Sequence, residues 1–170
     1  MKITTERLII SEITINYASF YLELVNDPTH LQFIPDKKIY SIADAENHIT
    51  TKIIKEYQNQ GFGFYLVSLK SDKTPIGMCG LIDRDGLDTL DIGFSFLKKY
   101  RGKGFAFESS KAILEFAKNT LKVNEIAAIT TLDNVKSANL LERLGFKFSK
   151  NIRIPNDPDE LRLFLVNLKK

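Results

Sequence analysis

The chain has 170 residues, of which 44% are hydrophobic and 26% are charged, and its formal net charge at pH 7 is +3. This length and composition indicate a single domain (residues 1–170) with a sizeable core. The small net charge argues against nucleic acid as a partner, and no apolar run is long enough to span a membrane. A lone cysteine, Cys79, excludes an internal disulfide and favours the cytoplasm, and its apolar neighbours indicate a buried structural thiol.

The first third of the chain is predicted to be mainly helical. Its pattern predicts a strand over 5–13, a helix over 16–26, a loop over 29–40 and a second helix over 41–61. Asp27-Pro28 ends the first of these helices, because proline cannot continue a helix. Ser41 and Asp44 have the spacing of a capping box, so they are expected to begin the second helix.

Three strands are predicted next, over 62–70, 75–83 and 89–97, and their short connections indicate an antiparallel meander. The last of them alternates apolar residues with Asp91, Gly93 and Ser95. Gly93 inside a strand fits a bulge or a close ligand approach, and it equally fits a strand that is merely weakened.

The remainder is predicted to contain a helix over 104–121, a strand over 125–132, a helix over 134–144 and strands over 146–150 and 160–168. Gly145 is the expected C-terminal glycine of the shorter helix. A strand, a helix and a strand in succession suggest that strands 89–97 and 125–132 are parallel neighbours.

The segment 96–108 joins an apolar strand to an amphipathic helix through a glycine-bearing turn. Gly102 and Gly104 permit a close approach of the backbone, and the free N–H groups of the first helical turn face the same place. Four cations surround it, namely Lys98, Lys99, Arg101 and Lys103. The turn predicts a site for a pyrophosphate-bearing ligand, although the cations by themselves also fit a solvated turn. A third glycine is missing, so the turn does not match a dinucleotide fingerprint.

Two motifs resemble a known family. Arg101-x-x-Gly104-x-Ala106 is similar to the Q/R-x-x-G-x-G/A signature of the GNAT superfamily of N-acetyltransferases. Segment 134–146 resembles the N-x-x-S-x-x-L-x-E-x-L-G-F segment of its ribosomal-protein N-terminal (alanine) acetyltransferase-like branch. The resemblance covers nearly the whole chain. It implies an α+β (α/β three-layer) fold with a mixed, mostly antiparallel sheet flanked by helices and a splay between two parallel strands.

The resemblance also implies an acetyl-CoA-dependent N-acetyltransferase that acts on a primary amine. Main-chain groups near Phe94, Ser95 and Phe96 would pair with the pantetheine arm, and Asn134 would contact the cofactor near its thioester. Main-chain N–H groups would hold the pyrophosphate over the run Arg101, Gly102, Lys103, Gly104, Phe105 and Ala106.

The leaving thiolate, whose thiol has a pKa near about 8.5, would gain from an O–H donor. Many superfamily members place a tyrosine where this chain has Leu141, whereas the resembling branch has a serine one turn earlier, here Ser137. The plainer interpretations are that Ser137 is an ordinary first-turn residue and that Asn134 is an N-cap.

The amine must also lose a proton. An α-amine with a pKa of about 8 needs little help, whereas a lysine side chain near about 10.4 needs a stronger base. Asp91 is the best-placed carboxylate, with Asp83 and Glu46 in reserve. His30 and His48 have no metal-ligand spacing with each other or with Cys79, so no metal site is expected.

The alternative function is a non-catalytic acetyl-CoA-binding or sensing module, to which the missing tyrosine gives some weight. The acceptor stays open among protein α-amines, aminoglycosides, polyamines and amino acids, because loops such as 29–40 and 151–159 usually build acceptor pockets. The branch resemblance favours a protein N-terminus, and either a monomer or a homodimer fits.

Overall fold

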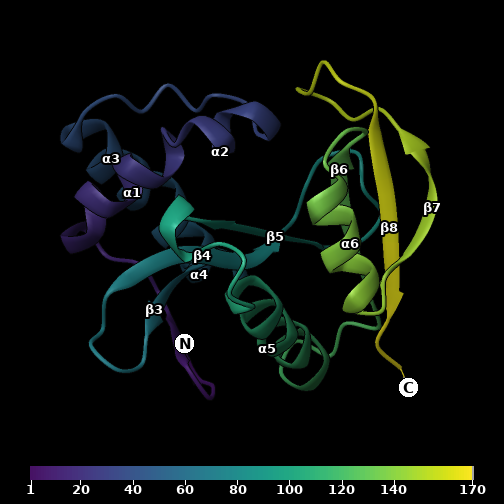
Figure 1. Cartoon of the computed structure of the whole chain (residues 1–170), viewed down its shortest axis with the longest axis horizontal. Helices are drawn as coiled ribbons and strands as arrows, with labels where there is room; N and C mark the ends of the chain where they lie inside the picture. Colours follow the sequence, from purple (N-terminus) through teal and green to yellow (C-terminus); the bar gives the residue numbers. More distant parts are fainter. Residues whose placement is uncertain (170) are drawn as a thin grey trace.

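The computed structural model describes residues 1–169. It contains one eight-stranded sheet of order β1-β2-β3-β4-β5-β6-β8-β7, with helices on both faces (Figure 1). Every neighbouring pair is antiparallel except β5 and β6, which confirms the predicted mixed, mostly antiparallel sheet. The strands are β1 (Lys2–Thr4), β2 (Leu8–Ser11), β3 (Phe64–Leu69), β4 (Pro75–Ile82), β5 (Asp91–Phe96), β6 (Glu125–Thr131), β7 (Lys147–Ile152) and β8 (Leu161–Asn167).

The helices agree with the predicted ones, with one addition. They are α1 (Ala18–Val25), α2 (Pro28–Phe33), α3 (Ile42–His48), α4 (Ile54–Gln60), α5 (Phe105–Asn119) and α6 (Val135–Arg143). A π-helical turn, η2 (Ile49–Ile53), joins α3 to α4, so the predicted second helix is one continuous helix. The capping box is confirmed, because Ser41 and Asp44 each accept the other's main-chain N–H through their side chains. Within residues 1–169, no helix has the length and hydrophobicity needed to cross a membrane.

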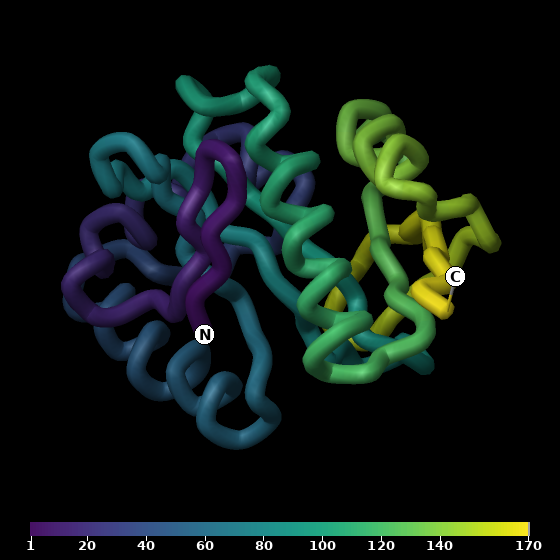
Figure 2. The backbone as a smooth tube through the Cα atoms, turned by 90° about the horizontal axis from the view of Figure 1, so that it is seen from below, coloured from purple at the N-terminus to yellow at the C-terminus, as the bar shows by residue number. Residues whose placement is uncertain are grey.

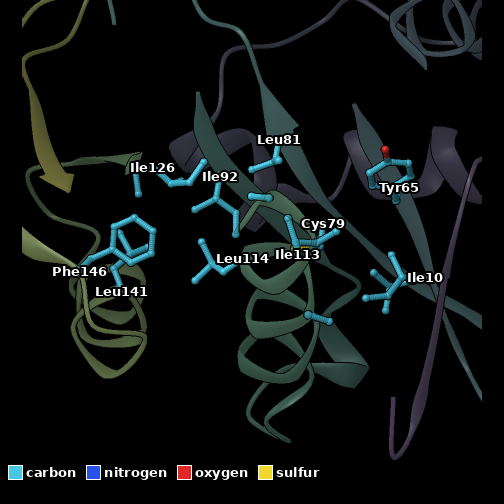
Figure 3. Packing of buried hydrophobic residues seen from close by; sticks show 14 of the residues in the cluster. Ile10, Tyr65, Cys79, Leu81, Ile92, Ile113, Leu114, Ile126, Leu141 and Phe146 are labelled. Atoms are coloured by element: carbon cyan, nitrogen blue, oxygen red, sulfur yellow. The ribbon is translucent and has the colours of Figure 1, made fainter. Parts of the chain in front are cut away.

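The sheet has a hydrophobic cluster on each face. Helices α5 and α6 cover one face, called here the α5 face, and α1 to α4 cover the other, called the α1 face (Figure 1). In Figure 3, Ile113 and Leu114 of α5 lie against Leu81 and Ile92 of the sheet. Cys79 is on this face and is fully buried, and burial raises the pKa of its thiol to about 11, which confirms a structural role.

Two predicted segments differ from the structure. The strand predicted over 5–13 is instead the second half of a hairpin, whose turn is closed by a hydrogen bond from Thr5 N to Leu8 O. The loop predicted over 29–40 contains α2, which Asp27 caps by accepting hydrogen bonds from Thr29 N and His30 N. Pro28 occupies the first turn, where its missing N–H costs nothing. Asp27-Pro28 therefore begins α2 as well as ending α1. With six residues, α2 is too short to show a hydrophobic period in the sequence.

Strands β5 and β6 pair at one end only. Their one register pair is Asp91 with Ala127, next to a hydrogen bond from Ala127 N to Leu90 O of 2.8 Å. Beyond it β6 stays paired with β8 through Thr131, and β5 stays paired with β4 through Phe96. The two parallel strands therefore part toward their carboxyl ends, which confirms the predicted splay.

Candidate functional site

The main chain of β5 has unpaired polar groups along the splay. Leu97 N donates to Ile76 O on the β4 side, whereas Leu90 O accepts from Ala127 N on the β6 side. These directions alternate along a strand, so the N–H and C=O groups of Phe94 and Phe96 face the gap beside β6. The main chain of Ser95 faces β4 instead. Of the three residues predicted to pair with the pantetheine arm, Phe94 has both main-chain groups in position to do so. Phe96 has only its N–H, because Phe96 O accepts a hydrogen bond from Arg101 Nε.

The glycine turn after β5 is open to solvent. Gly102, Lys103 and Gly104 are all exposed, and the two glycines have φ angles of +72° and +83° that favour glycine. The first helical hydrogen bond of α5 is that of Glu108 N to Gly104 O. Within residues 1–169, no acceptor is recorded for the N–H groups of residues 102–107. The turn therefore presents a row of free donors at the positive end of α5.

The N-terminal hairpin holds this turn in place. Glu108 forms an ion pair of 2.7 Å with Arg7 and accepts a hydrogen bond of 2.6 Å from the Thr5 hydroxyl. Arg7 also donates to Lys103 O at 2.9 Å and lies over the Phe105 ring. Figure 2 shows the purple hairpin beside the start of α5. These bonds use carbonyl and carboxylate oxygens, so they leave the N–H groups of the turn free.

One of the four cations that the sequence places around the turn is already paired. Arg101 donates to Phe96 O at 2.8 Å and forms an ion pair of 2.7 Å with Asp27. Its guanidinium therefore ties the turn to the start of α2. The available positive charge comes from Lys98, Lys99 and Lys103, which are exposed.

A second bond links α2 to β5. His30 Nδ1 lies 2.8 Å from Ser95 Oγ, on the α1 face of the sheet. Burial lowers the pKa of His30 to about 4, so the imidazole is neutral at pH 7. Together with Asp27, His30 fixes α2 against the strand that borders the splay. The sequence contained one signal for this arrangement, the N-cap and proline pair Asp27-Pro28.

The start of α6 lies at the open end of the splay, because β5 and β6 are parallel and α6 follows β6. Asn134 Oδ1 accepts a hydrogen bond from Ser137 N at 3.2 Å, so Asn134 is an N-cap as the plainer interpretation had it. Ser137 is half-buried, and no bond of its hydroxyl within residues 1–169 is recorded. Leu141 is 1% exposed and packs in the core beside Phe146 (Figure 3).

Asp91 lies at the closed end of the splay, four residues or roughly 13 Å along β5 from Ser95. Its carboxylate is buried and forms an ion pair of 3.2 Å with Arg84. Burial raises the pKa of Asp91 to about 6, and the nearby Arg84 opposes that shift. The reserve carboxylates Asp83 and Glu46 are exposed. The structure thus brings the glycine turn, Asn134 and Ser137 to one end of the gap and places Asp91 at the other.

A metal site is not evident. No group of three or more histidine, cysteine, aspartate or glutamate side chains among residues 1–169 is arranged to hold a metal ion. His48 stacks on Tyr21 with ring centroids 5.6 Å apart, whereas His30 contacts Ser95.

Comparisons with known proteins agree with this geometry. A family model described as an acetyltransferase (GNAT) domain matches residues 7–147. The uncharacterized N-acetyltransferase YnaD of Bacillus subtilis (strain 168) is 25% identical over 147 residues, which cover 86% of this chain and 83% of YnaD. The [ribosomal protein uS5]-alanine N-acetyltransferase of Escherichia coli (strain K12) is 32% identical over 98 residues, which cover 56% of this chain and 50% of that enzyme.

The fold is also that of solved acetyltransferases. RimL, a ribosomal alpha-N-protein acetyltransferase in complex with coenzyme A, superposes with a TM-score of 0.83 at 15% identity, over 98% of both chains. Since the family model spans most of the chain and the splayed parallel strands are in place, the protein belongs to the GNAT family of acetyltransferases.

Proposed function

We propose that the protein transfers the acetyl group of acetyl-CoA to a primary amine by direct attack. One observation carries the proposal: β5 and β6 pair only at Asp91 and Ala127, and this leaves main-chain groups of β5 unpaired beside an open glycine turn. The pantetheine arm would lie along Phe94 and Phe96 like an added strand. The N–H groups of residues 102–106 and the exposed lysines would hold the pyrophosphate. The N–H group of Arg101, also predicted for this role, instead donates to Lys98 O at 3.2 Å. The complex of RimL, which shares this fold, with coenzyme A supports coenzyme A as the ligand.

The residues around the gap can supply the steps of the transfer. The amine nitrogen forms the new C–N bond, the C–S bond of the thioester breaks, and the amine gives up one proton. A main-chain N–H of β5 would stabilise the charge that develops on the thioester oxygen, an effect typically worth about 3 kcal/mol. Ser137 would donate a proton to the leaving sulfur from the α5 face.

Asp91 would accept the proton of the amine from the α1 face. Its pKa of about 6 leaves the carboxylate ionised at pH 7 while making it a better base than an exposed aspartate. Because Asp91 is 1% exposed, the proton would have to reach it through an intervening water.

A protein N-terminus is the acceptor that we favour, because the uS5-alanine N-acetyltransferase is 32% identical over the matched 98 residues. A non-catalytic acetyl-CoA-binding module is the second candidate, since the buried Leu141 offers no proton donor. A cytoplasmic location and a monomeric or homodimeric state stay predictions.

The test is to incubate the protein with acetyl-CoA and a mixed library of peptides, polyamines, aminoglycosides and amino acids. Mass spectrometry then detects products that are heavier by one acetyl group, and calorimetry measures the binding of coenzyme A. We expect both binding and acetylated products. Binding without any product would favour the sensing module, and the absence of binding would contradict both candidates.

Replacing Gly102 with alanine is expected to weaken coenzyme A binding about tenfold, because a left-handed backbone costs an L-residue roughly 1–2 kcal/mol and shifts the N–H groups of the turn. Gly61→Ala is the matched control. Both glycines have positive φ angles, of +72° and +78°, and neither has an atom within 4 Å of the position of a new Cβ. Both variants should lose similar stability in thermal melts, whereas calorimetry should show weaker binding for Gly102→Ala alone. Equal affinities of the two variants for coenzyme A would contradict the assignment of the turn.

A further inference from the structure

Ser95 ends an otherwise apolar row of side chains on the α1 face of the sheet. The row crosses three strands, because Leu66 of β3 pairs with Met78 of β4, and Met78 pairs with Ser95 of β5. Leu66 and Met78 are each 1% exposed and belong to the hydrophobic cluster of this face, whereas Ser95 is half-buried. The next strand, β6, has already parted from β5 at this level. A hydroxyl group therefore ends the row where it meets the gap.

His30 of α2 holds this hydroxyl group. Its Nδ1 atom lies 2.8 Å from Ser95 Oγ, and this is the one bond of Oγ recorded within residues 1–169. A serine hydroxyl has one hydrogen to donate and two lone pairs that can accept. The contact uses one lone pair if Nδ1 carries the proton of the imidazole, and it uses the hydrogen if Nδ1 accepts. In either tautomer, Oγ keeps at least one lone pair for a ligand.

The surroundings of His30 suit it to hold the hydroxyl group rather than to accept a proton. The residue is 8% exposed, and its second ring nitrogen, Nε2, has no hydrogen-bond partner among residues 1–169. Protonation would leave a charged Nε2–H group buried without a partner, which is costly. The carboxylate of Asp27, one turn earlier, is already paired with Arg101. His30 is therefore suited to be a positioning residue.

An aromatic ring lies next to Ser95 on the same face. Gly93 is two residues before Ser95, so both are on the α1 face, and a Cβ at residue 93 would lie 2.9 Å from Cε2 and Cζ of Phe64. The Phe64 ring thus reaches across β4 and fills the space above Gly93. Gly93 is midway between Ser95 and Asp91, about 7 Å along the strand from each. An amine beside the ring could reach Ser95 directly and Asp91 through water.

A hydroxyl group suits the form of the amine that reacts. Attack on the thioester requires a neutral nitrogen with a free lone pair, whereas a carboxylate in contact with the nitrogen would favour the ammonium form. Ser95 Oγ is uncharged and can accept a hydrogen bond from a neutral N–H group. Such a bond fixes the nitrogen and leaves its lone pair free to attack.

We propose that Ser95 Oγ accepts a hydrogen bond from the nitrogen of the primary amine on the α1 face, and that His30 positions this hydroxyl group. The ring of Phe64 would contact the carbon next to the nitrogen. This inference rests on the proposed function and names the residues that bind its acceptor. Acetyl-CoA would be held by main-chain groups of β5 and of the glycine turn, so the loss of the Ser95 hydroxyl should affect the acceptor alone.

The test measures kcat and the KM for the acceptor at saturating acetyl-CoA. The probe is a hexapeptide amide that begins with alanine or, if another amine of the mixed library reacts faster, that amine. We expect Ser95→Ala to raise the KM about fivefold and to keep kcat within about twofold, because the lost bond holds the amine equally before and during attack. Its affinity for coenzyme A should not change. Ser149→Ala, which removes an exposed hydroxyl of β7, is the matched control and should keep all three values.

Two variants of His30 separate positioning from proton transfer. His30→Leu fills a similar volume without the bond to Ser95, so it should raise the KM about as much as Ser95→Ala does. His30→Asn keeps a polar atom near the place of Nδ1 and should restore most of the lost affinity for the amine. Thermal melts check that both variants fold, and Ser95→Ala decides the case by itself if they do not.

An unchanged KM in Ser95→Ala would overturn the inference and leave the proposed function intact, since the amine would still be acetylated. A loss of affinity for coenzyme A in Ser95→Ala would also overturn it, because Ser95 would then serve the cofactor. If His30→Asn keeps the KM but loses kcat, His30 accepts a proton and its positioning role is wrong. Failure to acetylate any amine of the mixed library would contradict the proposed function itself.

Discussion

Ser137→Ala is expected to lower kcat about a hundredfold, because a positioned general acid typically contributes about 10²- to 10⁴-fold to a rate. Ser137 is half-buried at the first turn of α6, at the open end of the splay, and its hydroxyl forms no hydrogen bond with the residues in the range 1–169. The cap of the helix should survive the substitution, because Asn134 Oδ1 accepts from the main-chain N–H of residue 137. The change therefore removes a proton donor with little effect on the fold.

The measurement is the rate of thiol release at saturating acetyl-CoA, with the affinity for coenzyme A measured separately. Asn134→Ala is the informative comparison, because it removes the cap and should cost about 1 kcal/mol of unfolding free energy. Ser137→Ala should leave the free energy of unfolding nearly unchanged and yet have a lower kcat than Asn134→Ala. If Ser137→Ala retains the full rate when chemistry limits turnover, the serine is not the acid.

Phe164→Ala is expected to lower the free energy of unfolding by about 3–5 kcal/mol, the usual cost of truncating a buried aromatic ring. Phe164 is 1% exposed and lies in β8, where it pairs with Ala128 on one side and Phe148 on the other. Removing it opens a cavity between the sheet and α6 at the end of the sheet that carries β6. A domain of this size is typically stable by about 5–15 kcal/mol, so the loss is a large fraction of the total.

Phe148→Ala is the matched control, because the two rings contact each other with centroids 5.9 Å apart while Phe148 is 54% exposed. Its loss should cost about 1 kcal/mol or less. Urea unfolding of both variants gives the two free energies. Similar losses would show that the ring contact, and not burial in the core, stabilises this end of the sheet.

The elements that were predictable from sequence depend on local chemistry. The capping box at Ser41 and the N-cap Asn134 each satisfy main-chain groups within a few residues. Gly102 and Gly104 adopt positive φ angles, which depend on the residue type itself. The parallel placement of β5 and β6 follows from the helical crossover between them, because parallel strands need a long connection of this kind. The short helix α2 was missed because six residues are too few for a hydrophobic period.

Amino-acid sequence alone thus determined the strands and helices other than β1 and α2, the glycine turn and the family motifs, since each depends on neighbours along the chain. Tertiary structure decided which distant residues meet. The pairing of Arg101 with Asp27, the contact of His30 with Ser95 and the position of Glu56 beside Gly63 depend on how helices pack across the sheet. Such contacts join residues that have no periodic or spacing relation, so only the folded backbone brings their side chains within bonding distance.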